Sequence, residues 1–343
     1  MILDKIKFND LLAQLVKQGA SDLYLSAGKP PIFKIINELR PANNEILTGD
    51  KIEELFSSLI SDEQKRILQN KKSLIFGKTF ENGLRFKVNL FYQSNFLSAD
   101  LHFISPVIRS IKELGLPNQV EEIAEIKNGL VVLSGPFNSG KSTTSASIIE
   151  YLNNKKQLKI ITLEKPIEII FISKKSIIQQ REIGLDTPNL ETGLKDCLET
   201  NLDIVFVDGF ENKKEFELIL ELSEQGKTVF LITNANSALD TVAKFLSFFN
   251  QDEKSRIQNI LSRTLKAVLC QKLISSRIIG TRNKSNNFIV VPEILFQTQA
   301  VQSSIQDNNI KQLDNIIKTS AKQGMISFEQ SLNELVKQGV VAA

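Results

Sequence analysis

Apolar and polar positions in the first third of the chain follow helix spacing in some stretches and strand spacing in others. Residues 7–18 carry apolar side chains at helical spacing, and a second helix is expected with Asp50 as its cap. This mixture predicts a smaller α+β domain over residues 1–105. The stretches expected as strands are 20–31 with its turn, 32–36, 73–80, 84–93 and 97–104.

The remainder of the chain alternates between strand-like and helix-like patterns. Alternation of this kind predicts a mostly parallel sheet covered on both faces, in an α/β core over residues 119–272. We expect a linker over 106–118 before it and a mainly helical region over 273–343 after it. The expected elements are strand 158–163, strand-like pieces near 168–171 and 176–179, helix 190–200, strand 204–207, helix 212–224, strand 228–233, helix 237–248, helix 253–269 and strand 288–295.

One stretch near the start of this core carries a recognisable chemical pattern. The apolar run 130–133 predicts a buried strand, and the positions after Thr143 have helical spacing. Between them lies the phosphate-loop pattern of Gly, four residues, Gly, Lys and Ser. Its residues are Gly135, Pro136, Phe137, Asn138, Ser139, Gly140, Lys141 and Ser142.

Each part of this loop has a role in binding a phosphate. The two glycines allow a tight turn that points N–H groups at an anion, and the helix that follows presents its positive end. Lys141 is expected to neutralise phosphate charge, and Ser142 to hold Mg²⁺. The alternative, a glycine-rich turn with a surface lysine, does not account for the strand before the loop and the helix after it. The candidate nucleotide-binding residues are Gly135, Asn138, Ser139, Gly140, Lys141, Ser142 and Thr143.

Length, net charge and cysteine content limit which classes of protein fit the sequence. The 343 residues suggest two or three domains, and a net charge of +3 is too small to indicate a nucleic-acid or membrane surface by itself. The cysteines, Cys197 and Cys270, lie far apart and have no metal-ligand spacing, which favours a reducing, cytoplasmic setting. No apolar run approaches the roughly 20 residues that a membrane span needs.

Several further stretches resemble the type IV pilus retraction ATPases, the PilT/PilU family. In that family, the residue at the position of Tyr24 is usually His. The similarity spans nearly the whole chain, and its strength lies in the order and spacing of the stretches together. The matching stretches are Ala20–Gly28, Arg85–Asn89, Gln180–Gly184, Gly324–Met325 and Phe328–Leu332.

The resemblance implies a PAS-like domain before a RecA-like phosphate-loop core. It also implies ATP and Mg²⁺ as ligands and assembly into a homo-hexamer, or into a mixed hexamer with a related ATPase. Such rings work on the cytoplasmic side of the inner membrane, with a pilus platform protein as partner and without nucleic acid. Secretion and pilus-assembly ATPases of the same superfamily carry a four-cysteine zinc element, and the two cysteines of this chain argue against that branch.

The acidic box of the family departs from its pattern in this chain. Glu164 stands where the family has the carboxylate that activates the attacking water, and Lys165 replaces an acid. An adjacent cation is expected to lower the basicity of that carboxylate. The alternative is a solvated surface pair, which the preceding strand disfavours.

The second nucleotide motif also departs from the family. Where the family ends an apolar strand with Gly-Glu, this chain has Asp208 followed by Gly209. Two interpretations stay open: Asp208 contacts Mg²⁺ through water, or it is a solvated turn residue.

The family also has a histidine box with two histidines. In this chain, Lys227 and Asn234 stand at those two positions. Asn234 can donate a hydrogen bond to a phosphate but carries no charge. Arg85 matches a family arginine and is a candidate arginine finger, with a surface ion pair as the alternative. The single histidine, His102, lies near another family arginine, although a lone histidine is more often structural.

Two hypotheses follow from an intact loop in altered surroundings. The first is an ATP-binding subunit of a pilus retraction (twitching motility) motor, with weak hydrolysis that depends on Glu164. The second is a regulatory or structural paralogue that binds ATP without turnover and docks on an active relative.

Overall fold

The computed structural model describes residues 5–36, 38–275 and 288–339. Its helices in these ranges are too short or too polar to span a membrane.

The chain divides into two compact units that are not continuous in sequence. Unit 1 contains the residues up to Val107 together with Lys165–Ile170. Unit 2 contains Ile108–Glu164 and the residues from Phe171 onward. The chain therefore passes between the units three times, and one of these passages directly follows Glu164.

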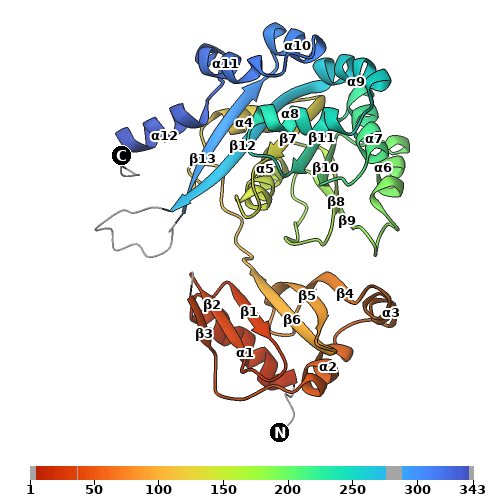
Figure 1. Cartoon of the computed structure of the whole chain (residues 1–343), viewed down its shortest axis with the longest axis vertical. Helices are drawn as coiled ribbons and strands as arrows, with labels where there is room; N and C mark the ends of the chain where they lie inside the picture. The colour runs from red at the N-terminus through yellow and green to blue at the C-terminus, as the bar shows by residue number, and fades with distance from the viewer. Residues whose placement is uncertain (1–4, 37, 276–287, 340–343) are drawn as a thin grey trace. The chain divides into compact units, whose positions relative to one another are not determined.

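Unit 1 is built on one antiparallel sheet. Its elements are α1 (Lys5–Lys17), β1 (Asp22–Leu25), β2 (Ile32–Ile35), β3 (Glu38–Pro41), α2 (Gly49–Ser57), α3 (Asp62–Lys71), β4 (Ser73–Thr79), β5 (Arg85–Gln93) and β6 (Phe96–Ile104). The six strands lie in the order β3-β2-β1-β6-β5-β4 (Figure 1). Helix α1 packs on β1, and α2 packs on β6. The ring centre of Phe8 on α1 lies 6.0 Å from that of Phe56 on α2 and 5.7 Å from that of Phe80. This aromatic core confirms a mixed α+β unit.

Two local predictions in unit 1 need correction. Thr48, and not Asp50, caps α2, because the Thr48 side chain accepts a hydrogen bond from the Lys51 amide. Asp50 lies inside the first turn, where a carboxylate still favours the helix dipole. Helix α3 was not predicted from the sequence, although Ser61 and Gln64 form a capping box at its start.

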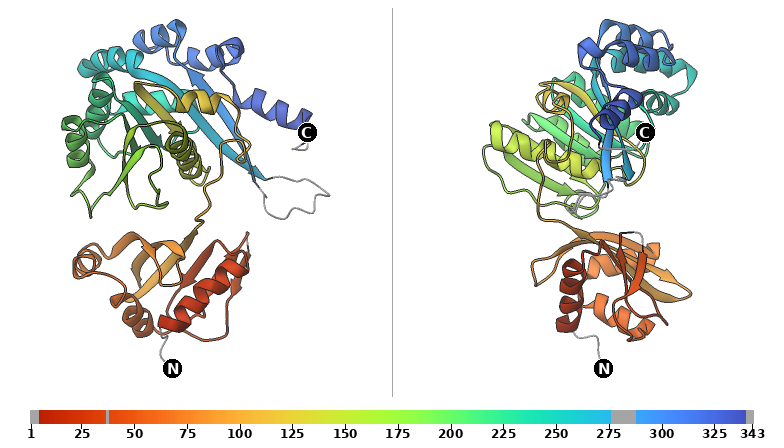
Figure 2. Two further views of the ribbon diagram at one scale, coloured as in Figure 1. Left: turned by 180° about the vertical axis from the view of Figure 1, so that it is seen from behind. Right: turned by 90° about the vertical axis from the view of Figure 1, so that its left-hand side faces the viewer.

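Unit 2 is built on a seven-stranded sheet with helices on both faces (Figures 1 and 2). Its elements are α4 (Gln119–Ala124), β7 (Gly129–Ser134), α5 (Lys141–Lys155), β8 (Lys159–Glu164), β9 (Ile177–Glu182), α6 (Leu190–Glu199), β10 (Ile204–Asp208), α7 (Lys213–Glu224), β11 (Thr228–Thr233), α8 (Ala238–Ser247), α9 (Gln251–Thr264), β12 (Leu265–Ser275), β13 (Phe288–Phe296), α10 (Gln299–Gln306), α11 (Gln312–Thr319) and α12 (Phe328–Lys337). The strands lie in the order β13-β12-β7-β11-β10-β8-β9, and every neighbouring pair is parallel except β12 and β13.

Strand β7 shows how the sheet separates two apolar cores. Leu130 and Val132 face the core beneath α6 to α9, whereas Val131 and Leu133 face the core beneath α4 and α5. A strand covered on both faces has an almost continuous apolar run, which is the pattern expected over 130–133. The alternating pattern of the sequence therefore predicted the α/β class correctly.

The helix expected over 253–269 ends earlier than predicted. Helix α9 ends at Thr264 and the chain continues as β12, in which Ala267, Val268 and Leu269 are fully buried. Spacing alone cannot distinguish a short apolar run in a central strand from a buried helix turn. Strand β13 confirms the strand expected over 288–295. No strand forms near 168–171.

Candidate functional site

The carboxyl ends of the parallel strands bring the expected site residues to one edge of the large sheet. Ser134 at the end of β7 pairs with Thr233 at the end of β11, and Asp208 ends the next strand, β10. Glu164 ends β8, which pairs with β10. In sheets of this kind, ligands bind outside the carboxyl ends of the strands.

The loop from Gly135 to Gly140 joins β7 to α5 in a conformation that requires its glycines. Gly135 has φ 152° and Gly140 has φ 85°, and Asn138 adopts a left-handed φ of 60° between them. A Cβ atom on Gly135 would lie 2.3 Å from the Gln271 carbonyl oxygen. Gly140 is the N-cap of α5 and has no side chain to satisfy the first-turn amides. The loop and helix end therefore leave backbone donors available for an anion.

Lys141 is folded back over this loop. Its Nζ donates to the carbonyls of Gly135 at 3.0 Å and Pro136 at 2.6 Å, and the residue is only 9% exposed. Burial is the main cause that lowers the pKa of Lys141; nearby Asp208 opposes this shift, and the charge of Lys244 adds to it. The ammonium group is thus held at the centre of the loop among weak, neutral acceptors that an anion can replace.

Gln271 on β12 braces the loop, and the sequence pattern did not predict this role. Its Nε2 donates to the Ser139 carbonyl at 2.7 Å, and its Oε1 accepts from the Thr144 hydroxyl at 2.9 Å. Gln271 is 1% exposed, so both bonds are buried. The only sequence signal was a polar residue within an apolar run, and that run was assigned to the wrong element.

We expect Gln271→Met to lower the free energy of unfolding by roughly 1–3 kcal/mol, because it leaves two buried polar groups without partners. It should also weaken ADP binding, since the loop loses its brace. Urea unfolding and calorimetric titration measure the two effects. Gln258→Met is the matched control, because Gln258 is also buried but bonds Asn308. A Gln271→Met variant with unchanged ADP affinity would contradict the bracing role.

Glu164 and Asp208 provide carboxylates at the ends of neighbouring strands. Glu164 Oε1 accepts from the Thr162 hydroxyl at 2.6 Å and from Gln180 Nε2 at 3.0 Å, so its orientation is fixed from within the sheet. Asp208 is exposed, and its charge acts on Lys141. The structure thus places both predicted acids at the same edge as the loop.

Arg85 contacts the segment that follows Glu164. Its guanidinium donates to the carbonyls of Ile167 at 2.7 Å and Glu168 at 2.6 Å, and Lys87 pairs with the Glu168 carboxylate at 2.9 Å. All of these residues belong to unit 1. The role of Arg85 as a finger toward another subunit stays a prediction, and it would require these bonds to be released.

Lys227 lies at the opposite end of β11 from the loop. Its Nζ donates to the carbonyls of Cys197 at 2.7 Å and Leu198 at 2.8 Å, which end α6. Lys227 therefore caps the end of α6. The replacement of the family histidine at this position does not change the charge at the carboxyl edge of the sheet. Asn234 does lie at that edge, directly after β11.

His102 pairs with Asp22 on the neighbouring strand of unit 1, with 2.9 Å between Nδ1 and Oδ1. This contact is the structural role that a lone histidine usually has.

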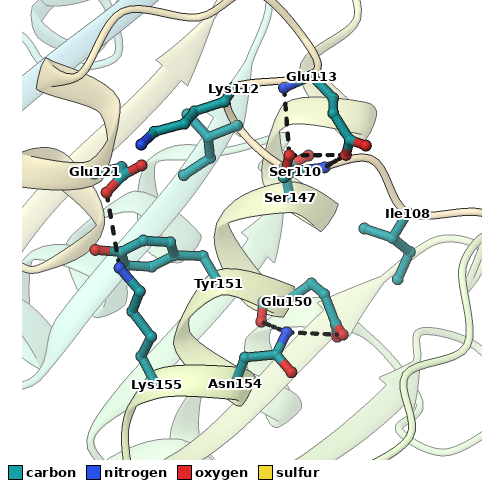
Figure 3. Close-up of a pocket in the computed structure, with 11 residues that line it drawn as sticks. Ile108, Ser110, Lys112, Glu113, Glu121, Ser147, Glu150, Tyr151, Asn154 and Lys155 are labelled. Carbon is teal, nitrogen blue, oxygen red and sulfur yellow. Dashed lines mark hydrogen bonds and ion pairs between the residues drawn. The ribbon is translucent and has the colours of Figure 1, made fainter.

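A cavity of about 400 Å³ lies along one side of α5 (Figure 3). Ser147, Tyr151 and Asn154 line it from the helix, and Ile108 and residues 110–113 line it from the opposite side. Glu150 and Glu121 contribute carboxylates to its wall. Ser147 is six residues beyond Lys141, about 9 Å along the helix, so the cavity is separate from the loop itself.

Comparisons with known proteins agree with this geometry. The family model described as type II/IV secretion system protein matches residues 106–338. The Pseudomonas aeruginosa type IV pilus ATPase PilT is 32% identical to this chain, with 97% of this chain and 95% of that protein covered. The type IV pilus ATPase PilU of the same organism is 30% identical, over 98% of this chain and 86% of that protein.

Solved structures show the same relationship. The pilus retraction motor PilT with bound ADP superimposes with a TM-score of 0.80 at 30% identity, covering 94% of this chain and 95% of that one. The Legionella pneumophila ATPase DotB gives a TM-score of 0.81 at 18% identity, covering 100% of this chain and 94% of that one, which shows the fold alone. This chain belongs to the type II/IV secretion system protein family and, within it, to the PilT- and PilU-like type IV pilus ATPases.

Proposed function

We propose that this protein is the ATP-binding subunit of a motor that retracts type IV pili. The observation that carries the proposal is the loop between β7 and α5, with its two left-handed glycines and buried Lys141. The ADP in the related PilT structure and the pilus functions of the relatives support the same ligand and the same machine. On binding, the terminal phosphates replace the loop carbonyls as partners of the Lys141 ammonium.

The residues at this edge also fit a magnesium ion. Ser142 in the first turn of α5 and Asp208 at the end of β10 offer hydroxyl and carboxylate oxygens. Magnesium prefers such hard oxygen ligands and takes only one or two from protein, the others coming from phosphate and water. It would supply neutralisation of the charge that develops on the phosphates.

In the proposed reaction, Glu164 accepts a proton from the attacking water. Its Oε1 is held by the Thr162 hydroxyl and by Gln180 Nε2, which fixes the orientation of the carboxylate. Positioning and charge around the terminal phosphate account for most of the catalysis in phosphate-loop enzymes. We propose weak turnover, because Gly209 stands where the family carries a glutamate and Asn234 where it carries a histidine.

We further propose that the subunits form a hexameric ring, of this chain alone or mixed with a related ATPase. The ring would act on the cytoplasmic side of the inner membrane, against a pilus platform protein.

A second function, in which the subunit binds ATP and regulates an active relative without turnover, is favoured by one feature. Gly209 has φ 88° and leaves no carboxylate directly after Asp208.

The decisive experiment measures Mg-ATP turnover and ADP affinity of the purified protein in parallel, with Lys141→Ala as the control. Turnover that Lys141→Ala abolishes supports the motor. Nucleotide binding without turnover supports the regulatory subunit. An absence of ADP and ATP binding in excess Mg²⁺ would overturn both functions.

A further inference from the structure

Lys244 on α8 lies at the carboxyl edge of the sheet, and no step described so far uses it. Its Nζ donates to the Thr233 hydroxyl at 2.7 Å and to the Asn234 carbonyl at 3.2 Å, both at the end of β11. The ammonium also lies 5.7 Å from the ring centre of Phe210, which follows β10. The side chain therefore reaches the edge between the ends of β11 and β10, beside the phosphate loop that follows β7.

The position of this ammonium is electrostatically unfavourable without an anion. Burial lowers the pKa of Lys244, and the charge of Lys244 contributes to the lowered pKa of Lys141. Two cations that are both removed from water and repel each other destabilise the site. A polyanion between them removes the repulsion and gains charge-assisted hydrogen bonds from both.

The position of Lys244 changes which lysine supplies positive charge at the carboxyl edge of the sheet. Lys227 caps α6 at the far end of β11, and Asn234 is neutral. Lys244 brings a full positive charge to the strand end that carries Asn234. The edge thus keeps a cation on the side of the site opposite α5.

We propose that Lys244 binds the terminal phosphate of ATP and thereby distinguishes ATP from ADP. The inference rests on the proposed nucleotide-binding function and deepens it. The Nζ exchanges its bonds to Thr233 and Asn234 for oxygens of the γ-phosphate, while the Lys141 ammonium contacts the β-phosphate. Since Lys244 holds the Asn234 carbonyl only when the γ-phosphate is absent, its exchange also reports the nucleotide state to the β11–α8 connection.

The test compares affinities of the full chain for Mg-ADP and for the non-hydrolysable analogue AMP-PNP by calorimetry. Lys244→Gln keeps a donor toward Thr233 and Asn234 but removes the charge. We expect it to weaken AMP-PNP binding about tenfold or more and to change ADP affinity by less than about threefold. Lys244→Arg, which keeps the charge, should recover most of the preference for AMP-PNP.

Lys227→Met is the matched control, because it removes a lysine that lies next to β11 and donates to the Cys197 and Leu198 carbonyls, away from the phosphate loop. It should lower the thermal unfolding temperature and leave both affinities unchanged. Thermal unfolding of every variant shows which of them fold, and Lys244→Met provides a second uncharged variant.

The outcomes separate this inference from the proposed function. Normal ADP binding with a selective loss of AMP-PNP binding in Lys244→Gln supports the inference. Equal losses for both ligands would assign Lys244 a structural role and overturn it, as would unchanged affinities. If the wild-type protein binds neither ligand, the proposed function fails together with the inference.

Discussion

Replacing Gly135 with alanine is expected to abolish nucleotide binding while the protein remains folded. A Cβ atom at this position would lie 2.3 Å from the Gln271 carbonyl and 2.5 Å from the Ser139 hydroxyl, at a φ of 152° that side chains rarely adopt. The loop would have to move away from β12, and its N–H groups would no longer converge on one anion. A strain of about 3 kcal/mol corresponds to a loss of about 100-fold in affinity, measured by titration with Mg-ADP.

A second glycine in unit 2 provides the control for this variant. Gly226 has φ 87°, but an added Cβ atom would meet nothing within 4 Å. Gly226→Ala should therefore cost about 1–2 kcal/mol of stability from backbone strain and leave ADP affinity unchanged. A Gly135→Ala protein that still binds ADP as tightly as the wild type would show that the loop geometry does not form the binding site.

Replacing Glu164 with glutamine should lower Mg-ATP turnover by about 10²–10⁴-fold, the usual contribution of a positioned general base. Glutamine has nearly the same shape and keeps an oxygen that can accept from Thr162, but an amide cannot take a proton from water. ADP affinity should change by less than about threefold, because binding depends on the loop. Phosphate release and calorimetric titration measure the two quantities.

The control for the carboxylate is Glu168→Gln, which removes an acid four residues further along the chain. Glu168 pairs with Lys87 in unit 1, so turnover should be retained. If Glu164→Gln turns over ATP at the wild-type rate, another group activates the water. If the wild-type protein binds ATP but shows no turnover, the regulatory function replaces the motor.

Local patterns predicted the parts of the site that are contiguous in sequence. The loop from Gly135 to Ser142 is one short segment between a strand and a helix, so its pattern and its flanks identify it together. Alternating elements predicted the α/β class, because most crossovers between the parallel strands run through a helix; the connection from β8 to β9 is the exception. The expected acids at positions 164 and 208 also lie where the strand ends place them.

The residues that complete the site come from distant segments and had no local signal. Gln271 meets the loop because β12 pairs with β7, and a 132-residue separation between Gln271 and Ser139 is invisible to spacing arguments. Lys244 looked like an ordinary helix lysine. Conversely, Lys227 attracted attention through its neighbours in sequence, although its side chain caps α6. The pairing of strands that are distant in sequence decides which polar residues face the site. The spacing of residues shows only which side chains share a face within one helix or strand.

The segment Lys165–Ile170 would have a mechanical consequence if the chain serves the proposed retraction motor. Its contacts belong to unit 1 through Arg85 and Lys87, whereas Glu164 belongs to unit 2. A load that displaces one unit would therefore act on the short stretch of main chain between Glu164 and the Ile167 and Glu168 carbonyls that Arg85 binds. Under the proposed function, force would reach Glu164 through the main chain, and the rate of ATP turnover would depend on the resistance of the filament being withdrawn.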